Sequence, residues 1–358
     1  LFFIQLLCFF RGEYSPLYLT CVGWILCTVR VQCIVECLAG KQLVVPSHCN
    51  SSELFLTTAG LDPVLKILII CTCHTVYCVT ICGNLLIIIL VSYSKVLHSP
   101  MYFFLSQLSA LDVMLSTDIL PNMISTVLAN KTTMSFSGCL AQFSFFALTG
   151  CSECLLLTAM SWDRYLAICR PLHYTLKMNY QVCWILVILC WILGIFLVLT
   201  YTLTISNLQF CGPNIIDHFF CDFDPIIQLS CSDTTIVRLE VTVLGFIFVI
   251  FPFLTIFVSY SYIIVTILKI PSITGRQKVF STCSSHLTVV SIYYGTLVCV
   301  YLVPNKGQTQ TLNKVLALLY TVVTPMMNPI IYSLRNKDLK MAVRKFIIDF
   351  LFISFSKD

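Results

Sequence analysis

The sequence predicts an all-α membrane protein, in which a seven-transmembrane helix bundle is followed by a short amphipathic C-terminal helix. The 358 residues are 58% hydrophobic and only 10% charged, and their mean hydropathy is +0.92. Soluble globular domains carry about 25% charged residues, so this composition excludes an ordinary soluble globule. The net charge of +5 is modest and does not indicate a nucleic-acid partner.

Seven apolar segments are each long enough to cross a bilayer, which takes about 20 residues. They lie at 66–92, 101–127, 139–168, 182–205, 237–268, 279–303 and 312–334. Each must be a helix, because an open strand would leave backbone groups without hydrogen-bond partners in lipid. Prolines within these segments, such as Pro121 and Pro252, are tolerated in packed transmembrane helices. The sequence shows no internal repeat, so the helices are expected to form one domain.

Basic residues mark one set of the loops and ends that join these segments. This set holds Lys95, Arg170, Lys177, Lys269, Arg276, Lys278, Arg335, Lys337, Lys340, Arg344 and Lys345. The opposite set mixes three lysines with acids: Lys131, Lys306, Lys314, Asp217, Asp222, Asp224 and Asp233. Because cytoplasmic loops carry an excess of Lys and Arg, the N-terminus is predicted to be extracellular and the C-terminus cytoplasmic. The expected location is the plasma membrane, which the chain crosses several times.

Residues 1–48 do not fit this helical pattern and are expected to be an atypical N-terminal extension, interpreted as a gene-model artefact. No Met precedes Met101, and the apolar stretches 1–10 and 17–29 are short and interrupted by charges. A signal peptide without a clear cleavage site and a short eighth membrane helix are the alternatives. Just beyond, Asn50 opens an Asn-Ser-Ser glycosylation acceptor, which suits an outside tail.

The most informative string is Ser-Trp-Asp-Arg-Tyr-Leu-Ala-Ile-Cys-Arg-Pro-Leu-His-Tyr at 161–174. It places Asp163 and Arg164 at the membrane interface, at the end of an apolar segment. Charged residues in or next to a membrane helix cost free energy and usually have a function. This string resembles the olfactory receptor branch of the rhodopsin-like G-protein-coupled receptors. Trp162 and Ser161 depart from the family pattern, where Tyr and Ala are typical.

Further motifs carry the same resemblance along nearly the whole chain from the first helix onward. They are Gly-Asn at 83–84, Pro-Met-Tyr-Phe-Phe-Leu at 100–105, Lys-Val-Phe-Ser-Thr-Cys-Ser-Ser-His-Leu at 278–287, and Pro-Met-Met-Asn-Pro-Ile-Ile-Tyr at 325–332. The resemblance implies a receptor domain at 49–335 and a cytoplasmic tail with an amphipathic helix at 336–358.

The function implied by the resemblance is that of an odorant-activated receptor. It would bind small, mostly apolar volatile ligands and activate a stimulatory G protein to raise cyclic AMP, in the cilia of olfactory sensory neurons. No H-E-x-x-H, G-x-S-x-G or P-loop string occurs, so an enzyme is not expected. The alternatives are a rhodopsin-like receptor for a non-odorant ligand outside the olfactory epithelium, and a non-functional receptor gene product.

The Asp-Arg pair is the predicted latch of the resting state. Arg164 would be held by Asp163 and by polar groups on the sixth helix near 278–281, until an agonist shifts the balance toward an open bundle. The resemblance assigns the activation and G-protein contacts to Asp163, Arg164, Tyr165, Tyr260, Lys278 and Tyr332.

A polar centre is predicted inside the bundle. Asp112 and Glu153 are acids within apolar segments, where ionisable residues face the interior and mark function. With Asn84 and Asn328 they form a cluster whose counterpart in related receptors can hold a sodium ion. A buried hydrogen-bond network that only holds the helices together is the equal alternative. No other cofactor is expected.

The chain has 21 cysteines, and most lie inside apolar segments, where they behave as small hydrophobes. Cys139 lies at the outer start of the third segment, and Cys211, Cys221 and Cys231 lie in the long outer loop. Four cysteines allow three pairings. The family resemblance implies Cys139–Cys221 and Cys211–Cys231, which would pin the long outer loop as a lid. A metal site at His218 and Cys221 is not expected, because a disulfide-bonded cysteine has no free thiolate.

The predicted ligand contacts lie on the outer halves of the third, fifth, sixth and seventh helices. Counting helical turns from the motifs gives Phe146, Ala147, Gly150, Cys151, Leu244, Phe248, Tyr294, Leu297, Tyr301 and Thr321. This set is almost entirely apolar with a few hydroxyls, as in small-molecule pockets. At the inner end, 335–350 alternates basic and apolar residues, which predicts a helix lying on anionic lipid of the inner leaflet.

Overall fold

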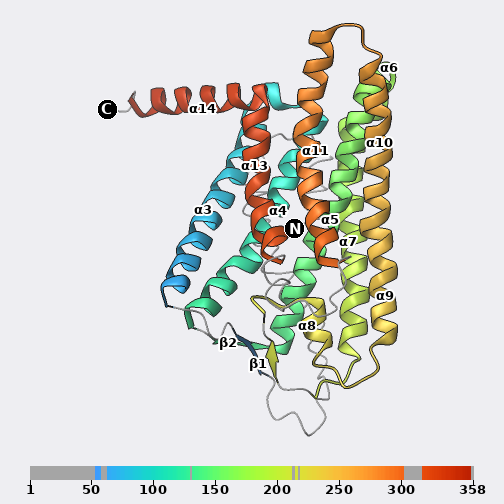
Figure 1. The fold of residues 1–358 in the computed structure, drawn as a ribbon. Coiled ribbons are helices and arrows are strands. Elements are labelled where there is room, and N and C mark those ends of the chain that lie inside the picture. The colour runs from blue at the N-terminus through green and yellow to red at the C-terminus, as the bar shows by residue number, and fades with distance from the viewer. Residues whose placement is uncertain are drawn as a thin grey trace.

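A computed structural model of the chain describes residues 53–57, 63–129, 131–211, 214–216, 218–301 and 317–355. The extension at 1–48 and the glycosylation candidate Asn50 lie outside these ranges. Figure 1 shows long helices packed side by side into a bundle, with a small sheet at one end and a helix that projects sideways from the other end. The long helices are α3 (Pro63–Tyr93), α4 (Pro100–Ala129), α5 (Phe136–Cys169), α7 (Tyr180–Ser206), α10 (Phe251–Leu268), α11 (Ile273–Tyr301) and α14 (Lys337–Phe355).

Shorter elements join and extend these helices. They are η1 (Lys95–Leu97), α6 (Pro171–Lys177), α8 (Phe223–Ile227), α9 (Thr235–Gly245), η2 (Phe246–Ile250), η3 (Leu319–Val323) and α13 (Thr324–Arg335). α9, η2 and α10 run on as one helical rod, and η3 runs into α13 in the same way.

Five helical segments among the described residues are long and apolar enough to cross a membrane. These are Lys66–Tyr93, Pro100–Ala129, Phe136–Cys169, Tyr180–Ser206 and Thr235–Leu268. They match the first five predicted segments to within a few residues. α11 covers most of the sixth predicted segment, and η3 with α13 covers most of the seventh.

A three-stranded sheet closes the end of the bundle opposite α14, in the order β2-β1-β3. β1 (Glu53–Thr57) pairs antiparallel with β2 (Lys131–Ser135) and parallel with the two-residue β3 (Ile215–Ile216). The sequence analysis did not predict these three short strands, although the rest of the described chain is mainly helical, as expected. Leu54 and Leu56 lie two residues apart in β1 and are both buried, as expected for one face of a strand.

Two π-helical turns interrupt the rods, and each directly precedes a proline in the next turn. At η2 the N–H of Phe251 bonds to the carbonyl of Phe246, and at η3 the N–H of Thr324 bonds to that of Leu319. Pro252 and Pro325 follow these residues and have no N–H to donate. The extra residue in each turn accommodates the proline ring, and such turns are frequent at functional sites.

Candidate functional site

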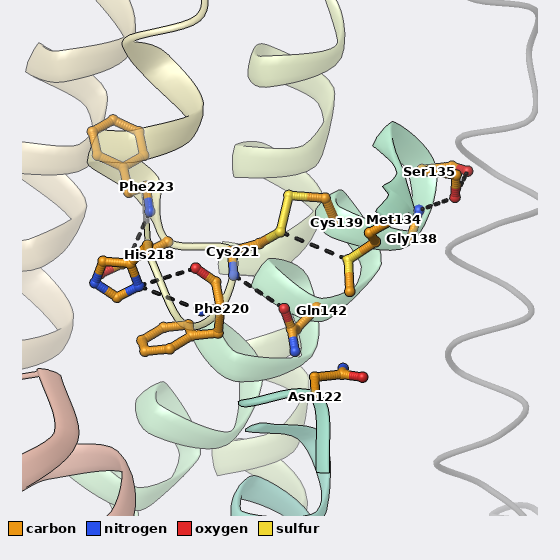
Figure 2. The surroundings of a disulfide bond; sticks show 12 residues. Asn122, Met134, Ser135, Gly138, Cys139, Gln142, His218, Phe220, Cys221 and Phe223 are labelled. Atoms are coloured by element: carbon orange, nitrogen blue, oxygen red, sulfur yellow. Dashed lines mark hydrogen bonds between the residues drawn. A yellow bond between two sulfur atoms is a disulfide. The ribbon is translucent and has the colours of Figure 1, made fainter. Parts of the chain in front are cut away.

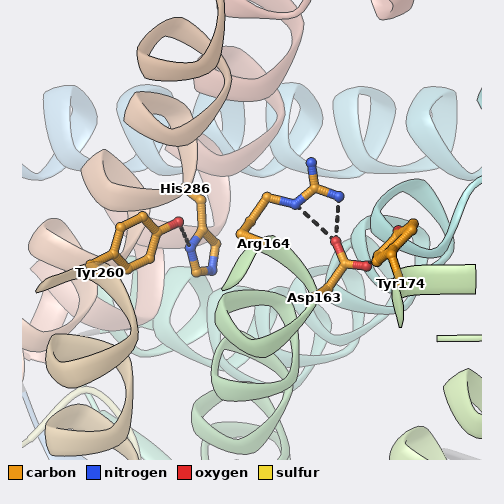
Figure 3. A network of polar contacts seen from close by, with 5 residues as sticks. All are labelled: Asp163, Arg164, Tyr174, Tyr260 and His286. Carbon is orange, nitrogen blue, oxygen red and sulfur yellow. Dashed lines mark hydrogen bonds and ion pairs between the residues drawn. The ribbon is translucent and has the colours of Figure 1, made fainter. Parts of the chain in front are cut away.

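The Asp163 carboxylate is the centre of a buried polar cluster at the end of α5. One of its oxygens accepts hydrogen bonds from the Arg164 guanidinium, with 2.8 Å to Nε. The other accepts a 2.8 Å bond from the Tyr174 hydroxyl on α6. Figure 3 shows Arg164 turned toward Asp163. The Asp163 side chain is fully buried and that of Arg164 is 14% exposed, so both charges are paired away from water.

Tyr174 owes its position to the start of α6. Pro171 opens that helix, where its missing N–H costs nothing, and Tyr174 lies one turn further on. Burial and the neighbouring Asp163 carboxylate raise the pKa of Tyr174 above its ordinary value. The hydroxyl therefore remains protonated and donates its hydrogen to Asp163.

A second contact joins α10 to α11 beside this cluster. The Tyr260 hydroxyl lies 2.7 Å from Nδ1 of His286, and the two rings stack at 5.6 Å. Both side chains are buried. The buried hydroxyl of Tyr332 has no hydrogen-bond partner among the described residues. The predicted hold on Arg164 near 278–281 is untested, because the side chains of Lys278 and Ser281 lie outside the described part.

The predicted polar centre is assembled in the middle of the bundle. Nδ2 of Asn328 on α13 lies 3.0 Å from both carboxylate oxygens of Asp112 on α4. Nδ2 of Asn84 on α3 donates to the carbonyl oxygens of Thr80 and Pro325, at 3.0 and 3.1 Å. These hydrogen bonds link α3, α4 and α13. Glu153 on α5 is buried, like the other three side chains.

The polar centre has oxygen atoms that suit a small hard cation. Oδ1 of Asn84, Oγ of Ser116 and Oε1 of Glu153 are buried without hydrogen-bond partners in the described part of the chain. Ser116 lies one helical turn from Asp112 on α4. Carboxylate, amide and hydroxyl oxygens are the ligands that hard cations prefer, so the residues fit a sodium ion.

The outer loop is tied to the third predicted helix by a disulfide bond between Cys139 and Cys221, whose Cα atoms are 5.4 Å apart. Figure 2 shows Gln142 of α5 beside this bond. Its Oε1 accepts a 3.0 Å bond from the Cys221 N–H, while its Nε2 donates to the Asp118 carbonyl of α4. A second disulfide joins Cys211 to Cys231. Both bonds are the pairings that the resemblance implied.

An aromatic cluster lies beneath this loop. The Phe220 ring is fully buried and packs 5.6 Å from Phe146 of α5, which in turn lies 5.7 Å from Tyr320 of η3. Asp222 caps α8 through the N–H of Phe223 and accepts a 3.4 Å bond from the Tyr320 hydroxyl. Burial raises the pKa of Asp222, although nearby His218 and the Phe223 N–H oppose that shift.

The structure brings half of the predicted ligand contacts into one apolar cluster. Its members from that set are Phe146, Ala147, Cys151, Leu244 and Phe248. Tyr294 and Leu297 belong instead to the neighbouring core, where Tyr294 packs against Phe253 at 5.0 Å.

The other three predicted contacts are placed differently. Thr321 is buried and donates to the Ala317 carbonyl, one turn back on its own helix. The carbonyl of Gly150 accepts a bond from α11. The side chain of Tyr301 lies outside the described part of the chain.

Tyr293 connects the ligand candidates to α11. Its hydroxyl donates a 3.0 Å bond to the Gly150 carbonyl and lies 3.2 Å from Sγ of Cys154. Phe248 and Thr321 occupy the two π-helical turns. The apolar cluster is therefore bordered by irregular turns on two rods and by one polar contact between α5 and α11.

Several site residues were not singled out from the sequence. Tyr174, His286 and Tyr293 stand inside or beside the quoted motifs, but a motif does not show which atoms meet. Gln142 gave no signal. Asp118 is an acid within an apolar segment, so the rule that identified Asp112 applies to it as well. Its Oδ2 is buried without a hydrogen-bond partner among the described residues.

An apolar helical bundle with a buried Asp-Arg pair at one end and a disulfide-tied loop at the other defines a multi-pass membrane protein of the receptor type. The olfactory receptor family model matches residues 73–350. Olfactory receptor 1M1 of Mus musculus is 44% identical to the chain, over 84% of the chain and 96% of that protein.

Two further relatives are similar over comparable lengths. Olfactory receptor 5P60 of Mus musculus is 46% identical, over 84% of the chain and 93% of that protein. Olfactory receptor 10A7 of Homo sapiens is 42% identical, over 85% of the chain and 96% of that protein. The chain belongs to the olfactory receptor family, whose members are receptors and not enzymes.

Proposed function

We propose that this chain is an odorant-activated receptor that binds small, mostly apolar volatile molecules and activates a stimulatory G protein to raise cyclic AMP. The observation that carries the proposal is the buried Asp163–Arg164 pair, held by Tyr174, in a member of the olfactory receptor family. An ion pair buried this way needs compensating contacts. A role as a two-state switch explains why the chain keeps an ion pair whose burial costs free energy.

The proposed architecture has seven membrane helices with an extracellular N-terminus, in the plasma membrane of olfactory cilia. Basic residues on one set of loops support this orientation. α14 then lies at the cytoplasmic end, where its exposed Lys340, Arg344 and Lys345 meet anionic lipid or the G protein. Asn50 is the proposed glycosylation site of the outside tail.

The proposed ligand site is the apolar cluster around Phe146, Cys151 and Phe248. Apolar walls with few orienting polar groups suit a small volatile molecule. Position 146 holds Phe, whereas amine receptors place an acid there to bind their cation. Phe220 of the loop packs on Phe146, so the loop forms one wall of the proposed site.

Coupling between the two ends runs through Tyr293. A ligand beside Gly150 and Cys151 competes with the bond from the Tyr293 hydroxyl to the Gly150 carbonyl. Loss of that bond frees α11 from α5. Because α11 also carries His286, its movement breaks the Tyr260–His286 bond and leaves Tyr260 available to Arg164. The ligand shifts this equilibrium only by its different affinity for the two states.

The polar centre stabilises the resting state in this scheme. Asp112, Glu153, Asn84 and Asn328 would hold a sodium ion, whose charge offsets that of the two carboxylates. Asp112→Asn and Glu153→Gln should each abolish the sodium dependence of signalling. If the sodium dependence of signalling is unchanged in both variants, the polar centre has only a structural role.

The experiment that tests the function is an odorant panel read out through cyclic AMP in cells that display the receptor on their surface. We expect apolar volatiles to raise cyclic AMP in the wild type. Arg164→Ala should abolish the response at equal surface density, and Tyr293→Phe should raise basal signalling. A matched control is Tyr262→Phe, a lipid-exposed tyrosine on α10. A wild type displayed at the surface that answers no apolar volatile would contradict the proposal.

A further inference from the structure

A groove at the junction of α3, α13 and α14 lies outside the Asp-Arg cluster, the polar centre and the ligand cluster, and it adds a specific site to the lipid contact proposed above for α14. Its cavity volume is about 120 Å³. Its walls come from Gly83, Leu86 and Leu90 of α3, Pro329 of α13, and Leu339 and Val343 of α14. A dry apolar cavity of about 150 Å³ accepts a benzene-sized guest. The groove therefore fits a short stretch of alkyl chain.

The groove opens toward the hydrocarbon of the membrane. Among its lining residues, Val79, the farthest from α14 along α3, is 42% exposed, whereas Ile87 and Leu90 are buried. Because α3 is long and apolar enough to cross the bilayer, this opening faces lipid chains. A chain from the surrounding bilayer can enter without crossing a polar surface.

Cations stand beside the groove on α14. Lys340 and Arg344 directly follow the groove-lining Leu339 and Val343, which places them on the adjoining side of the helix. Both are exposed, and neither has an ion pair among the described residues. Their positive charge therefore faces the headgroup region above the opening.

The acids of α14 point the other way. Asp338 accepts a 3.0 Å bond from the Tyr102 hydroxyl of α4, and Asp349 accepts a 3.1 Å bond from the Tyr93 hydroxyl of α3. These contacts hold α14 against α3 and α4, and Figure 1 shows α14 running sideways from this end of the bundle. The acids are thereby kept away from the cations.

We propose that this groove binds one phospholipid with an anionic headgroup, whose acyl chain enters between α3 and α13 while its headgroup pairs with Lys340 and Arg344. Charge complementarity selects the headgroup, and the apolar opening selects the chain. In the orientation proposed above, this end faces the leaflet that is rich in anionic lipid. The bound lipid braces α14 against the bundle, which is a role separate from odorant recognition.

The test is native mass spectrometry of the purified full-length receptor in neutral detergent, titrated with dioleoyl phosphatidylserine. Dioleoyl phosphatidylcholine and glycerophosphoserine, the headgroup without chains, are the comparison ligands. We expect one phosphatidylserine to be retained, with phosphatidylcholine bound about tenfold more weakly and glycerophosphoserine not retained. Equal retention of the two lipids, or retention of glycerophosphoserine like that of the lipid, would overturn the proposal.

Substitutions of the basic residues test how much the headgroup contributes to lipid binding, apart from the acyl chain. The double variant Lys340→Gln with Arg344→Gln should weaken phosphatidylserine binding roughly 30-fold, at about 1 kcal/mol for each basic residue. Lys269→Gln, an exposed cation at the end of α10, is the matched control and should change nothing. If the double variant binds phosphatidylserine like the wild type, the headgroup assignment is wrong.

A larger side chain at the opening of the groove tests whether the acyl chain of the lipid binds there. Val79→Phe should weaken the binding of both lipids, whereas Ile89→Phe, at a 46% exposed position of α3 outside the groove, should not. Both positions already face lipid, so both variants should fold, and their thermal midpoints without added lipid check this. Unchanged lipid binding by Val79→Phe would overturn the groove as the site.

Discussion

The two ends of the bundle are held together by different kinds of contact. At the end that the proposed orientation places outside the cell, called the outer end, disulfide bonds from Cys139 and Cys211 and a three-stranded sheet fix the loop over the helices. At the inner end, side-chain hydrogen bonds hold Arg164 to Asp163 and Tyr260 to His286. Covalent bonds do not exchange partners on the timescale of signalling, whereas hydrogen bonds and ion pairs do.

This difference indicates which end is built to change. A fixed lid keeps the ligand cluster in one shape, so binding energy is not lost in ordering the loop. In the proposed scheme, the inner end exchanges one set of hydrogen bonds for another, as a two-state element requires. Breaking a contact at the outer end should therefore damage the receptor, while breaking one at the inner end should activate it.

The largest expected effect comes from the outer end. Cys139→Ser opens a bond that spans 82 residues, and the chain-entropy estimate for such a loop is about 4 kcal/mol. Surface staining of intact cells should fall close to background. Cys71→Ser, an exposed cysteine of α3 without a disulfide, is the control. If the Cys139 variant reaches the cell surface at normal density, the claim that the two ends have different roles is contradicted.

Next in size is the ion pair of the inner end. Asp163→Asn leaves Arg164 without its counter-ion, and basal cyclic AMP per surface receptor should rise roughly tenfold, equivalent to about 1.4 kcal/mol in favour of the open state. Asp233→Asn, an acid of the outer loop, is the control. Basal signalling no higher than in the wild type would show that the pair does not restrain the receptor.

A smaller effect is expected from the hydroxyl that supports this pair. Tyr174→Phe removes one hydrogen bond to Asp163, and basal signalling should rise roughly threefold, which corresponds to about 0.6 kcal/mol. The measurement is the same cyclic AMP assay, with Tyr262→Phe as control. An increase as large as that of Asp163→Asn would contradict the assignment of Arg164 as the main partner.

The smallest effect concerns Asp222 under the loop. Burial raises the pKa of this carboxyl in the folded protein, so protonation favours the folded state and ionisation costs stability as the pH rises above the unfolded value. Asp222→Asn keeps the cap on α8 and should raise the thermal midpoint by about 2 °C at pH 7.4. At pH 4 the gain should shrink. An equal gain at both pH values would exclude this titration as its cause.

Sequence reasoning predicted the helical segments well, because each had to meet the length of the bilayer and the chemistry of its core. It missed the strand at Leu54 and Leu56, since a run of only three apolar residues is a weak signal for a strand. It also missed the π-helical turns before Pro252 and Pro325. A proline marks a local irregularity, but its form depends on how the neighbouring helices pack.

At the site, the sequence identified residues better than it identified contacts. Asp163 and Arg164 are adjacent in the chain, so their pairing could be predicted without knowledge of the tertiary structure. Tyr174 reaches Asp163 only because α6 turns back at Pro171, and Tyr293 reaches Gly150 only through the packing of α11 on α5. These contacts depend on tertiary geometry, which no local pattern encodes.

The most direct test of the account is the distance between the inner ends of α6 and α11 when an odorant binds. Fluorophores on non-natural amino acids at the exposed positions Leu172 and Ile273 report this distance by energy transfer. With an agonist from the odorant panel, the transfer should fall as α11 leaves α5, and Cys139–Cys221 should stay intact. Unchanged transfer in a receptor that still raises cyclic AMP would contradict the opening of the inner end.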